Sequence, residues 1–586
     1  MSTRLASDTS KLGRLLNKER AVTFSFNGKR LKGFEGDTLA SALLANDQML
    51  VGRSFKYHRP RGIVAAGPEE PNALVNLGVD GTFEPNQRAT TTELFDGLLA
   101  TSQNHWPSLE FDVGALNAKL SRFMPAGFYY KTFIHPRPLW KYVYEPFIRQ
   151  AAGLGQAPKG RDQDTYEHYY AFCDVLIIGG GIAGLHAARA AARSGAKVLV
   201  LEQTAHWGGR APVDGGTVDG RPVDKVVDEL VSELSDMENV SLRLRTMGAG
   251  VYDHGYVLGY ERLTDHAPTA DGPRHRLWRI RAGHVVTATG AIERPLSFAG
   301  NDVPGVMLAS AVRDYAVNFG VSAGDRTVVV TNNDDAYRTA LVLKNAGLNV
   351  PVILDARVTP TDSALMAEAK AAGIRVMMGH GVAKVLGGKR VTGVAVCAQA
   401  GEGAVLEEIS CDAVAMSGGW SPVVHLWSHC GGKLLWDNDF AMFRPDVDKA
   451  PKGADGTGFV SPAGAANGHF GLTEILGDAH AMGQTAAEAT GFAPKRGKGP
   501  EGHSVDEAPL APVWLMPQGA GIALRSKSWL DYQNDVKVSD VQLAAQEGFE
   551  SVEHAKRYTT LGMATDQGKL SNINGLAILS DGKRIK

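Results

Sequence analysis

The alternation of hydrophobic and polar positions is clearest between residues 174 and 202. There DVLIIGGGIAGLHAARAAARSGAKVLVLE gives an apolar run, a glycine loop, an alanine-rich helical stretch and a second apolar run that ends in an acid. Two short apolar runs on either side of a helix predict a βαβ unit. We therefore expect a Rossmann-like α/β fold in this part of the chain.

The glycine loop of this unit indicates a dinucleotide-binding site. Gly179, Gly181 and Gly184 fill the three positions of the GxGxxG pattern. The first glycine allows a tight turn, the second lets a pyrophosphate approach the backbone, and the third lets the helix pack on the strand. The helix that begins at Ile182 and Ala183 then offers backbone N–H groups to the phosphates. The alternative is a glycine turn in an ordinary α/β unit.

An acid ends the second apolar run of the unit. Glu202 lies where a carboxylate can bind both hydroxyls of an adenosine ribose, so NAD or FAD fits better than NADP. Later segments of the same region add candidates for the remainder of the cofactor. The further candidate cofactor-binding residues are Gln203, Gly209, Arg210, Thr289, Gly290, Gly477 and Asp478.

A second βαβ pattern follows at residues 326–355, and Asp355 ends its second strand. Its loop, residues 331–335, reads TNNDD and contains no glycine. Each Cβ atom there would crowd a pyrophosphate, and the two carboxylates would repel it. We expect this unit to keep the fold without binding a second dinucleotide.

The N-terminal region, residues 20–110, predicts a small α+β unit with a hairpin that turns at Asn27-Gly28 and a helix capped by Asp37. The segment RSFKYHRPRG that follows contains Phe55, Tyr57 and several arginines. It is either a solvated loop or a surface that docks a partner. Residues 111–165 are rich in aromatic residues and prolines and predict a connecting arm that packs on other domains or on another chain.

The C-terminal region predicts two helices. Ser539 or Asp540 can cap the first, which runs through Ala545 and ends at Gly548, and the second spans Val552 to Tyr558. Hydroxyl and ammonium groups that could hold a phosphate, or that belong to a solvated helix end, gather after it. These candidates are Lys556, Thr559, Thr560, Thr565 and Lys569.

Composition excludes several classes of function. The 586 residues are 44% hydrophobic with a net charge of -2, so no strong field favours nucleic acid or a membrane surface. No signal peptide or membrane-length apolar run is present, and we expect a cytoplasmic protein. The four cysteines are scattered without a CxxC pair, which predicts buried thiols and no metal site. They are Cys173, Cys397, Cys411 and Cys430.

Several long motifs carry a resemblance to a known family. RSFKYHRPRG, AGPEEPNALV, TATGAIERP, TNNDDAYR and EGFESVEHAKRYTTLGMATDQGK are similar to the α subunit of heterotetrameric sarcosine oxidase. The resemblance implies four regions, which are a ferredoxin-like domain at 1–110, an arm at 111–165, a two-dinucleotide-domain flavoprotein fold at 166–500 and a small helical domain at 501–586. The second nucleotide fold is inserted at about 296–410.

The resemblance also bears on iron–sulfur clusters. Redox-active relatives of the two outer domains hold [2Fe–2S] clusters through four cysteine thiolates. Here other side chains stand at the expected ligand positions, so we expect both domains to be scaffolds without clusters. These positions are Ala65, Glu70 and Ala73 in the first domain and Asp531, Gln533, Asp566 and Ser571 in the last.

The activity that the resemblance implies is the conversion of sarcosine, water and oxygen to glycine, hydrogen peroxide and a one-carbon unit. The α subunit would bind NAD, with FAD as the alternative in the same site, and would share FMN with a β subunit. Lys556, Thr559, Thr560, Thr565 and Lys569 would lie at the FMN edge, and no catalytic residue is assigned. Further γ and δ subunits are expected, and the chain alone should be inactive.

One feature of the family is expected to be missing. Family members continue into an aminomethyltransferase-like domain that binds tetrahydrofolate, and this sequence ends at GLAILSDGKRIK, about where that domain begins. Two other functions remain open. They are a stand-alone NAD(P)H-dependent flavoprotein reductase and a subunit of a related amine or opine dehydrogenase complex.

Overall fold

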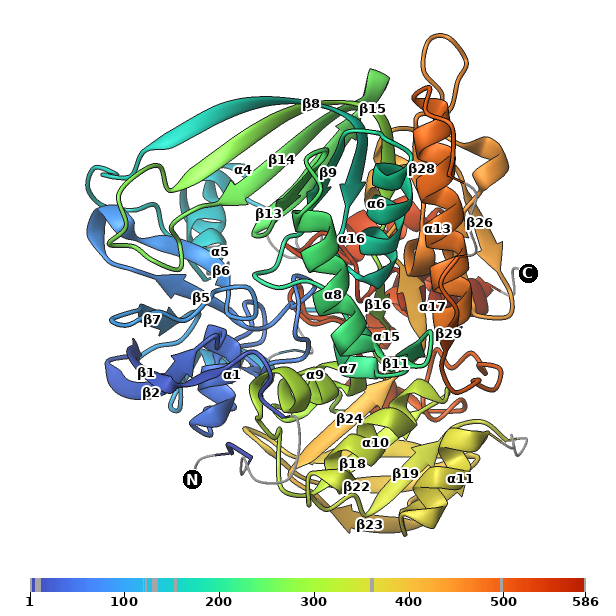
Figure 1. Ribbon diagram of the computed structural model, residues 1–586. Coiled ribbons are helices and arrows are strands. Elements are labelled where there is room, and N and C mark those ends of the chain that lie inside the picture. Colours follow the sequence, from blue (N-terminus) through green and yellow to red (C-terminus); the bar gives the residue numbers. More distant parts are fainter. Residues whose placement is uncertain are drawn as a thin grey trace. The chain divides into compact units, whose positions relative to one another are not determined.

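The computed structural model describes residues 3–5, 12–119, 121, 124–128, 135–151, 155–358, 363–495 and 499–583 (Figure 1). The chain forms two compact units, each assembled from separate stretches of sequence. Unit 1 comprises Met1–Gln163, Glu293–Gly419 and Glu507–Lys586, and unit 2 comprises Asp164–Ile292 and Trp420–Asp506.

Unit 2 is built on a seven-stranded sheet with the order β12-β9-β8-β15-β14-β13, and β28 pairs with β15. Strands β12, β9, β8, β15 and β28 run parallel, whereas β14 and β13 continue the sheet antiparallel. The strands are β8 (Tyr166–Ile178), β9 (Val198–Leu201), β12 (Val240–Arg243), β13 (Thr246–Tyr252), β14 (Tyr256–Arg262), β15 (His275–Thr287) and β28 (Val460–Pro462). The helices include α6 (Ile182–Arg193), α7 (Ala211–Asp214), α8 (Val223–Ser235), α12 (His425–His429) and α13 (Leu472–Ala489).

Burial on both faces explains the apolar runs of this unit. Val175 and Ile177 of β8 pack in a core with α6, α8 and α13, which cover one face of the sheet (Figure 1). Leu176 and Ile178 point into a second core on the opposite face. Parallel strands that are covered on both sides read as continuous apolar runs, as they do here.

Unit 2 also contains short strands outside the main sheet. A three-stranded sheet has the order β11-β10-β29, and β26 pairs with β27 as a hairpin. These elements are β10 (Thr217–Val218), β11 (Arg221–Pro222), β25 (Trp420–Pro422), β26 (Leu434–Asp437), β27 (Met442–Pro445) and β29 (Gly502–His503).

The N-terminal part of unit 1 is a five-stranded sheet with the order β2-β1-β7-β5-β6 and one helix. The predicted hairpin is confirmed, because β1 and β2 pair around Asn27 and Gly28, which both have positive φ. The helix begins one residue later than predicted, since Thr38 is its N-cap and Asp37 instead accepts a hydrogen bond from Ser41 Oγ. The elements are β1 (Asn17–Phe26), β2 (Lys29–Glu35), α1 (Leu39–Ala45), β3 (Gly52–Arg53), β4 (Pro60–Arg61), β5 (Leu74–Leu77), β6 (Glu84–Arg88) and β7 (Leu99–Ser102).

The middle of unit 1 contains the second predicted βαβ unit. A parallel sheet has the order β17-β24-β18-β19-β20, and an antiparallel sheet has the order β21-β22-β23. The strands are β17 (Val306–Leu308), β18 (Thr327–Thr331), β19 (Val352–Asp355), β20 (Arg375–Met378), β21 (His380–Gly387), β22 (Val391–Ala398), β23 (Glu407–Ser410) and β24 (Ala413–Ser417). The helices are α9 (Ala309–Phe319), α10 (Asp335–Asn345) and α11 (Ala364–Ala371).

The C-terminal part of unit 1 is helical, as predicted. The first predicted helix begins earlier than expected, because Lys537 is its N-cap and Asp540 accepts a hydrogen bond from the Lys537 N–H at 3.1 Å. The elements are α14 (Ile522–Arg525), β30 (Trp529–Asp531), β31 (Val536–Lys537), α15 (Val538–Gln546), α16 (Val552–Thr559) and α17 (Asn572–Lys583). The described residues of the predicted arm form α2 (Leu116–Lys119), α4 (Arg137–Leu139) and α5 (Glu145–Ala151), whereas 120, 122–123, 129–134 and 152–154 lie outside the described residues.

Both interpretations of the basic segment at residues 53–61 are wrong. Arg59 is buried, stacks over the Trp529 ring at 3.7 Å, and donates through Nε to Asp535 Oδ1 at 2.6 Å. Arg61 donates to the Gln533 carbonyl at 2.7 Å. The segment therefore joins the N-terminal domain to the helical domain inside unit 1, because only buried acids and carbonyls can stabilise so many buried guanidinium groups.

Candidate functional site

The glycine loop between β8 and α6 has two positions where only glycine fits. Gly179 has φ +112°, and a Cβ atom there would lie 2.2 Å from the Ala288 carbonyl oxygen. A Cβ atom on Gly184 would lie 1.8 Å from the Gly179 carbonyl oxygen. These two glycines allow the turn and the close packing of helix on strand, as the sequence pattern predicts.

Gly181 differs because space is left beside it. A Cβ atom on Gly181 would meet only Gly209 Cα, at 3.9 Å, and the residue has an ordinary φ of -70°. Gly181 is the N-cap of α6, and no side chain caps this helix. The first backbone N–H groups of α6, from Ile182, Ala183 and Gly184, therefore adjoin an open glycine, which is the arrangement that binds pyrophosphate.

Glu202 lies directly after β9 and supports the same loop. Its Oε2 accepts a hydrogen bond from the Gly180 N–H at 2.7 Å, and its Oε1 accepts one from the Thr204 N–H at 2.7 Å. Each carboxylate oxygen has a second lone pair, so Glu202 could accept hydrogen bonds from two further hydroxyl groups without losing either backbone donor. The side chain is 6% exposed, which strengthens such hydrogen bonds.

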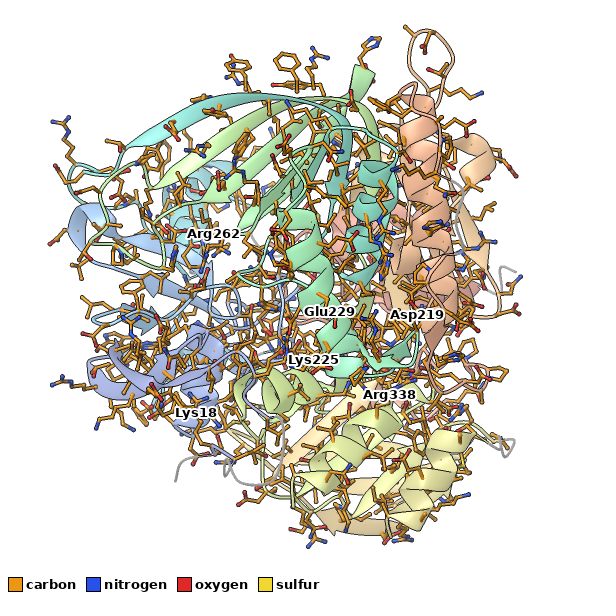
Figure 2. All side chains as sticks on the ribbon, viewed as in Figure 1. Lys18, Asp219, Lys225, Glu229, Arg262 and Arg338 are labelled. Atoms are coloured by element: carbon orange, nitrogen blue, oxygen red, sulfur yellow. The ribbon has the colours of Figure 1, made fainter. Side chains whose placement is uncertain are left out.

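The segment after Glu202 returns to the glycine loop. The Gly208 N–H donates to the Gly180 carbonyl at 2.9 Å, and a Cβ atom on Gly209 would lie 3.1 Å from Gly181 Cα. Arg210 pairs with Asp214 and lies over the Trp420 ring at 5.1 Å. The carbonyl of Gln203 accepts a hydrogen bond at 3.1 Å from Arg262, whose place at the end of β14 is marked in Figure 2.

The later candidates lie around the same loop. Thr289 donates through its hydroxyl to the Val423 carbonyl at 2.8 Å, and Gly290 has φ +73° with open space beside it. Gly477 on α13 is also open, and the neighbouring Asp478 accepts a hydrogen bond from the Gly464 N–H at 2.7 Å.

Sequence reasoning missed two residues that lie beside the glycine loop and Asp478. A Cβ atom on Gly464 would lie 2.6 Å from Ala183 Cβ, so Gly464 must be a glycine for its loop to reach the start of α6. Asn467 donates to Asp478 Oδ1 at 3.1 Å. The available signal was the run GAANG before the helical pattern of α13.

The second βαβ unit is closed by its own chain. Asp334 Oδ1 accepts a hydrogen bond from Arg357 at 2.6 Å, and Asp334 Oδ2 accepts one from the Ala508 N–H at 2.7 Å. Asn332 donates to the Ala511 carbonyl at 2.8 Å. Residues 508–511 therefore lie across the loop where the first unit has its open glycine.

The loop at the expected ligand positions of the ferredoxin-like domain is filled by Glu70. Its Oε2 accepts hydrogen bonds from the N–H groups of Val64 at 2.9 Å and Ala65 at 2.6 Å. Its Oε1 accepts them from Asn72 at 2.7 Å and Ala73 at 2.9 Å. Complete burial raises the pKa of Glu70 to about 7, although the four donors oppose the shift.

The helical domain has a similar arrangement. Asp531 Oδ1 accepts a hydrogen bond from the Asn534 N–H at 2.7 Å, and Oδ2 accepts one from the Gly562 N–H at 2.9 Å. Gln533 Oε1 accepts from the Thr565 hydroxyl at 2.7 Å. Burial, together with the nearby Asp566, raises the pKa of Asp531 to about 7.

These side chains do not fit a [2Fe–2S] cluster. Four thiolates hold such a cluster, and all cysteines of the sequence lie between residues 173 and 430, outside both loops. Among the described residues, no group of three His, Cys, Asp or Glu side chains could hold a metal ion.

The threonine hydroxyl groups of the predicted phosphate site after α16 donate hydrogen bonds inside the chain. The Thr559 hydroxyl donates to the Ala555 carbonyl at 2.7 Å and the Thr560 hydroxyl donates to the Thr559 carbonyl at 2.5 Å. Thr565 donates to Gln533, as described above, so all three hydroxyl hydrogens are used inside the chain. The cationic groups are Lys556, 4.0 Å from Glu553, and Lys569, whose pKa is lowered by burial.

The cysteines are separate and mostly buried. Cys173, Cys397 and Cys411 are buried, Cys430 is half-buried, and none forms a disulfide. Burial raises the pKa of Cys173 and Cys411 to about 12 and that of Cys397 and Cys430 to about 11. A thiol with so high a pKa is a poor nucleophile. In the described part of the chain, no helix has the length and apolar character needed to cross a membrane.

Comparison with known families defines the class of protein first. Residues 19–105 match the family described as "2Fe-2S iron-sulfur cluster binding domain", residues 173–441 match "Pyridine nucleotide-disulphide oxidoreductase", and residues 525–586 match "Sarcosine oxidase A3 domain". The chain thus combines a ferredoxin-like domain, a two-dinucleotide-domain flavoprotein fold and a helical domain. The predicted fold class is confirmed.

The relatives narrow this class to one family. "Sarcosine oxidase subunit alpha" of Rhizobium meliloti (strain 1021) is 44% identical over 97% of this chain and 56% of its own length. The protein of the same name from Corynebacterium sp. (strain P-1) is 37% identical over 99% of this chain and 55% of its own length. The chain belongs to the sarcosine oxidase α-subunit family, as the sequence motifs predicted, and spans about half the length of these relatives.

A solved structure shows the same fold along nearly the whole chain. The L-proline dehydrogenase from P. horikoshii matches with a TM-score of 0.65 and 21% identity, covering 98% of this chain and 94% of that chain. At this identity the likeness concerns the fold alone.

Proposed function

We propose that the chain is the nucleotide-binding subunit of an oxidase complex that converts sarcosine to glycine, hydrogen peroxide and a one-carbon unit. The observation that carries the proposal is the open glycine loop at Gly181 in a chain that is 44% identical to a sarcosine oxidase α subunit over 97% of its length. Amine binding and amine oxidation are assigned to a partner β subunit, and γ and δ subunits complete the assembly.

The nucleotide is NAD, with FAD as the alternative occupant of the same site. The N-terminus of α6 and Gly181 would receive the pyrophosphate, and Glu202 would accept hydrogen bonds from the adenosine ribose hydroxyls. Arg210, Gly290 and Gly477 would surround the other half. An acid at the end of β9 disfavours the 2′-phosphate of NADP.

FMN, shared with the β subunit, would be the group that reduces dioxygen when it is bound. We assign Lys556 and Lys569 to its edge, because ammonium groups can stabilise a phosphate or a negatively charged flavin ring. Thr559, Thr560 and Thr565 would position the loop that carries these lysines, since their hydroxyls donate within the chain.

A stand-alone NAD(P)H-dependent reductase is less well supported. Such an enzyme needs a second dinucleotide site, and here Asp334 binds Arg357 and Ala508 where that site would be. It also often uses a redox cysteine pair, whereas the cysteines here are isolated.

Two preparations, the complex and this chain purified alone, can test these proposals. The complex is purified through a tag on this chain, denatured, and its released nucleotides are identified by mass spectrometry, while a second sample is assayed for sarcosine-dependent peroxide. We expect NAD and FMN together with peroxide. Stoichiometric FAD with NADPH oxidation by the isolated chain would support the reductase instead. Peroxide that forms only with other secondary amines would show that the substrate is not sarcosine.

A further inference from the structure

The antiparallel extension of the unit 2 sheet exposes a face of aromatic and arginine side chains. Strand pairing aligns Tyr170, Arg279 and Leu258 in one row and Phe172, Arg281 and Tyr256 in the next, and we call these six residues the aromatic–arginine face. Tyr170 is 62% exposed and Phe172 is 70% exposed. The opposite face of the same strands buries Trp278, Ile280 and Val257 in a core. The exposed face is therefore a surface of a well-packed sheet.

The strand that carries the two aromatic residues has an open edge. β9 pairs with β8 only from Val175 onward, so in the described part of the chain no strand pairs with the outer edge of β8 from Tyr166 to Phe172. Long edge strands with large apolar side chains are usually covered, because their unpaired N–H and C=O groups accept any added strand. Tyrosine and arginine are also the residues that contribute most to binding energy at protein interfaces.

The charge of the face identifies the kind of partner. Arg279 lies over the Tyr170 ring at 5.5 Å and Arg281 over the Tyr256 ring at 4.9 Å. Over the residues that the structure describes, neither guanidinium is within ion-pair distance of a carboxylate, and none of the six residues is acidic. A second copy of the chain would bring arginines against arginines, which is unfavourable. The complementary surface carries Asp or Glu.

We propose that an extended, acid-bearing segment of a partner subunit binds here and adds to the outer edge of β8 as a further strand. Backbone hydrogen bonds to β8 would give affinity, and alternate carboxylates of the added strand would reach Arg279 and Arg281. The proposal rests on the proposed function only in that it requires a partner subunit.

A photo-crosslinking experiment on the intact complex tests the occupant. The substitution Tyr170→p-benzoylphenylalanine places a photoreactive ring on the face, and Trp436→p-benzoylphenylalanine places one on the exposed β26 hairpin as the control. After irradiation we expect position 170 alone to join this chain to a different subunit, within a peptide rich in Asp and Glu. Joining to a second copy, or to no chain, would overturn the proposal.

A charge reversal tests the arginines separately. Arg279→Glu with Arg281→Glu should raise the dissociation constant of the complex at least about tenfold, measured by mass photometry on dilution, whereas Lys225→Glu on α8 (Figure 2) should leave it unchanged. An unchanged melting temperature of the double variant would exclude unfolding as the cause. Full subunit retention in the double variant would contradict the proposal. Peroxide assays on the same samples separate the outcomes, because a cross-linked complex without sarcosine oxidation rejects the function and keeps the docking surface.

Discussion

The Glu70 carboxylate accepts a hydrogen bond from the Ala65 N–H at 2.6 Å, and the family resemblance predicts both positions to be those of cysteines in cluster-binding relatives. A loop that holds an iron–sulfur cluster directs backbone N–H groups at an anion. Here three further N–H groups, from Val64, Asn72 and Ala73, point at the same carboxylate. Above its pKa of about 7, the side chain thus supplies a negative charge at the point where these N–H groups converge.

The variant Glu70→Gln should be destabilised although it is nearly isosteric. At pH 8 the wild-type carboxylate is ionised and accepts four hydrogen bonds, whereas the amide nitrogen of glutamine would face two N–H donors. Leaving buried donors unpaired costs about 1–3 kcal/mol in free energy of unfolding. Urea unfolding at pH 8 measures the loss, and the exposed Glu19→Gln on β1 serves as the control. Equal stability of the two variants would contradict this role.

Three buried carboxyl groups should contribute less to stability as pH rises from about 4 to about 7. Burial raises the pKa of Glu70, Glu293 and Asp531 to about 7, whereas these groups titrate near 4 in the unfolded chain. In this window these groups hold protons in the folded state that they have released in the unfolded state, so their contribution to the free energy of unfolding decreases with pH and levels off above 7. Burial lowers the pKa of His186 to about 3 and that of His284 to about 4, and these two groups contribute a smaller slope of the opposite sign. Urea unfolding between pH 4 and 8 checks the slope.

The variant Asp531→Asn isolates one of these groups. It removes one titration, so the pH dependence between about 4 and 7 should become less steep, while the exposed Asp228→Asn on α8 should keep the wild-type slope. An unchanged slope in Asp531→Asn would show that Asp531 is ionised throughout this range.

The strands and turns were predictable because their sequence signals are local. The apolar runs of β8 and β9 follow from burial on both faces, and the turn at Asn27-Gly28 follows from its need for positive φ. The glycine loop was predictable for the same reason. The occupant of the cluster loop was not, because an alignment gives the position of Glu70 but not the direction of its carboxylate.

The basic segment shows a second limit of sequence reasoning. The sequence places Arg59 in a solvated loop or at a partner surface, because Phe55, Tyr57 and several arginines occur together in this segment. Its partners are Asp302 and Asp535, which lie 243 and 476 residues further along the chain. A buried charge and an exposed charge look identical in sequence when the paired acid is so distant.

Loss of Arg59 should therefore destabilise unit 1 strongly. Arg59→Ala would leave Asp535 buried without its cation, which costs about 3–5 kcal/mol in free energy of unfolding. Arg20→Ala removes an exposed pair with Glu35, 70% and 44% exposed, and should cost at most about 1 kcal/mol. Thermal and urea unfolding compare the two variants. Similar losses would mean that the Arg59 pair contributes no more than a surface pair.

The nucleotide site can be tested by a pair of glycines with the same local geometry. Gly181 and Gly521 are both helix N-caps, with φ of -70° and -72°, and both have room for a side chain. Gly181→Val should fold normally yet lower the NAD content of the purified complex at least about tenfold, because its methyl groups would occupy the pyrophosphate position. Gly521→Val should retain the full content.

The readout is nucleotide released per chain by mass spectrometry, together with the melting temperature. Gly184→Val provides the opposite case, since its Cβ atom would lie 1.8 Å from the Gly179 carbonyl oxygen and should lower the melting temperature itself. If Gly181→Val kept both its melting temperature and its nucleotide, the pyrophosphate would have to bind elsewhere, because no ligand could share that space with a valine side chain.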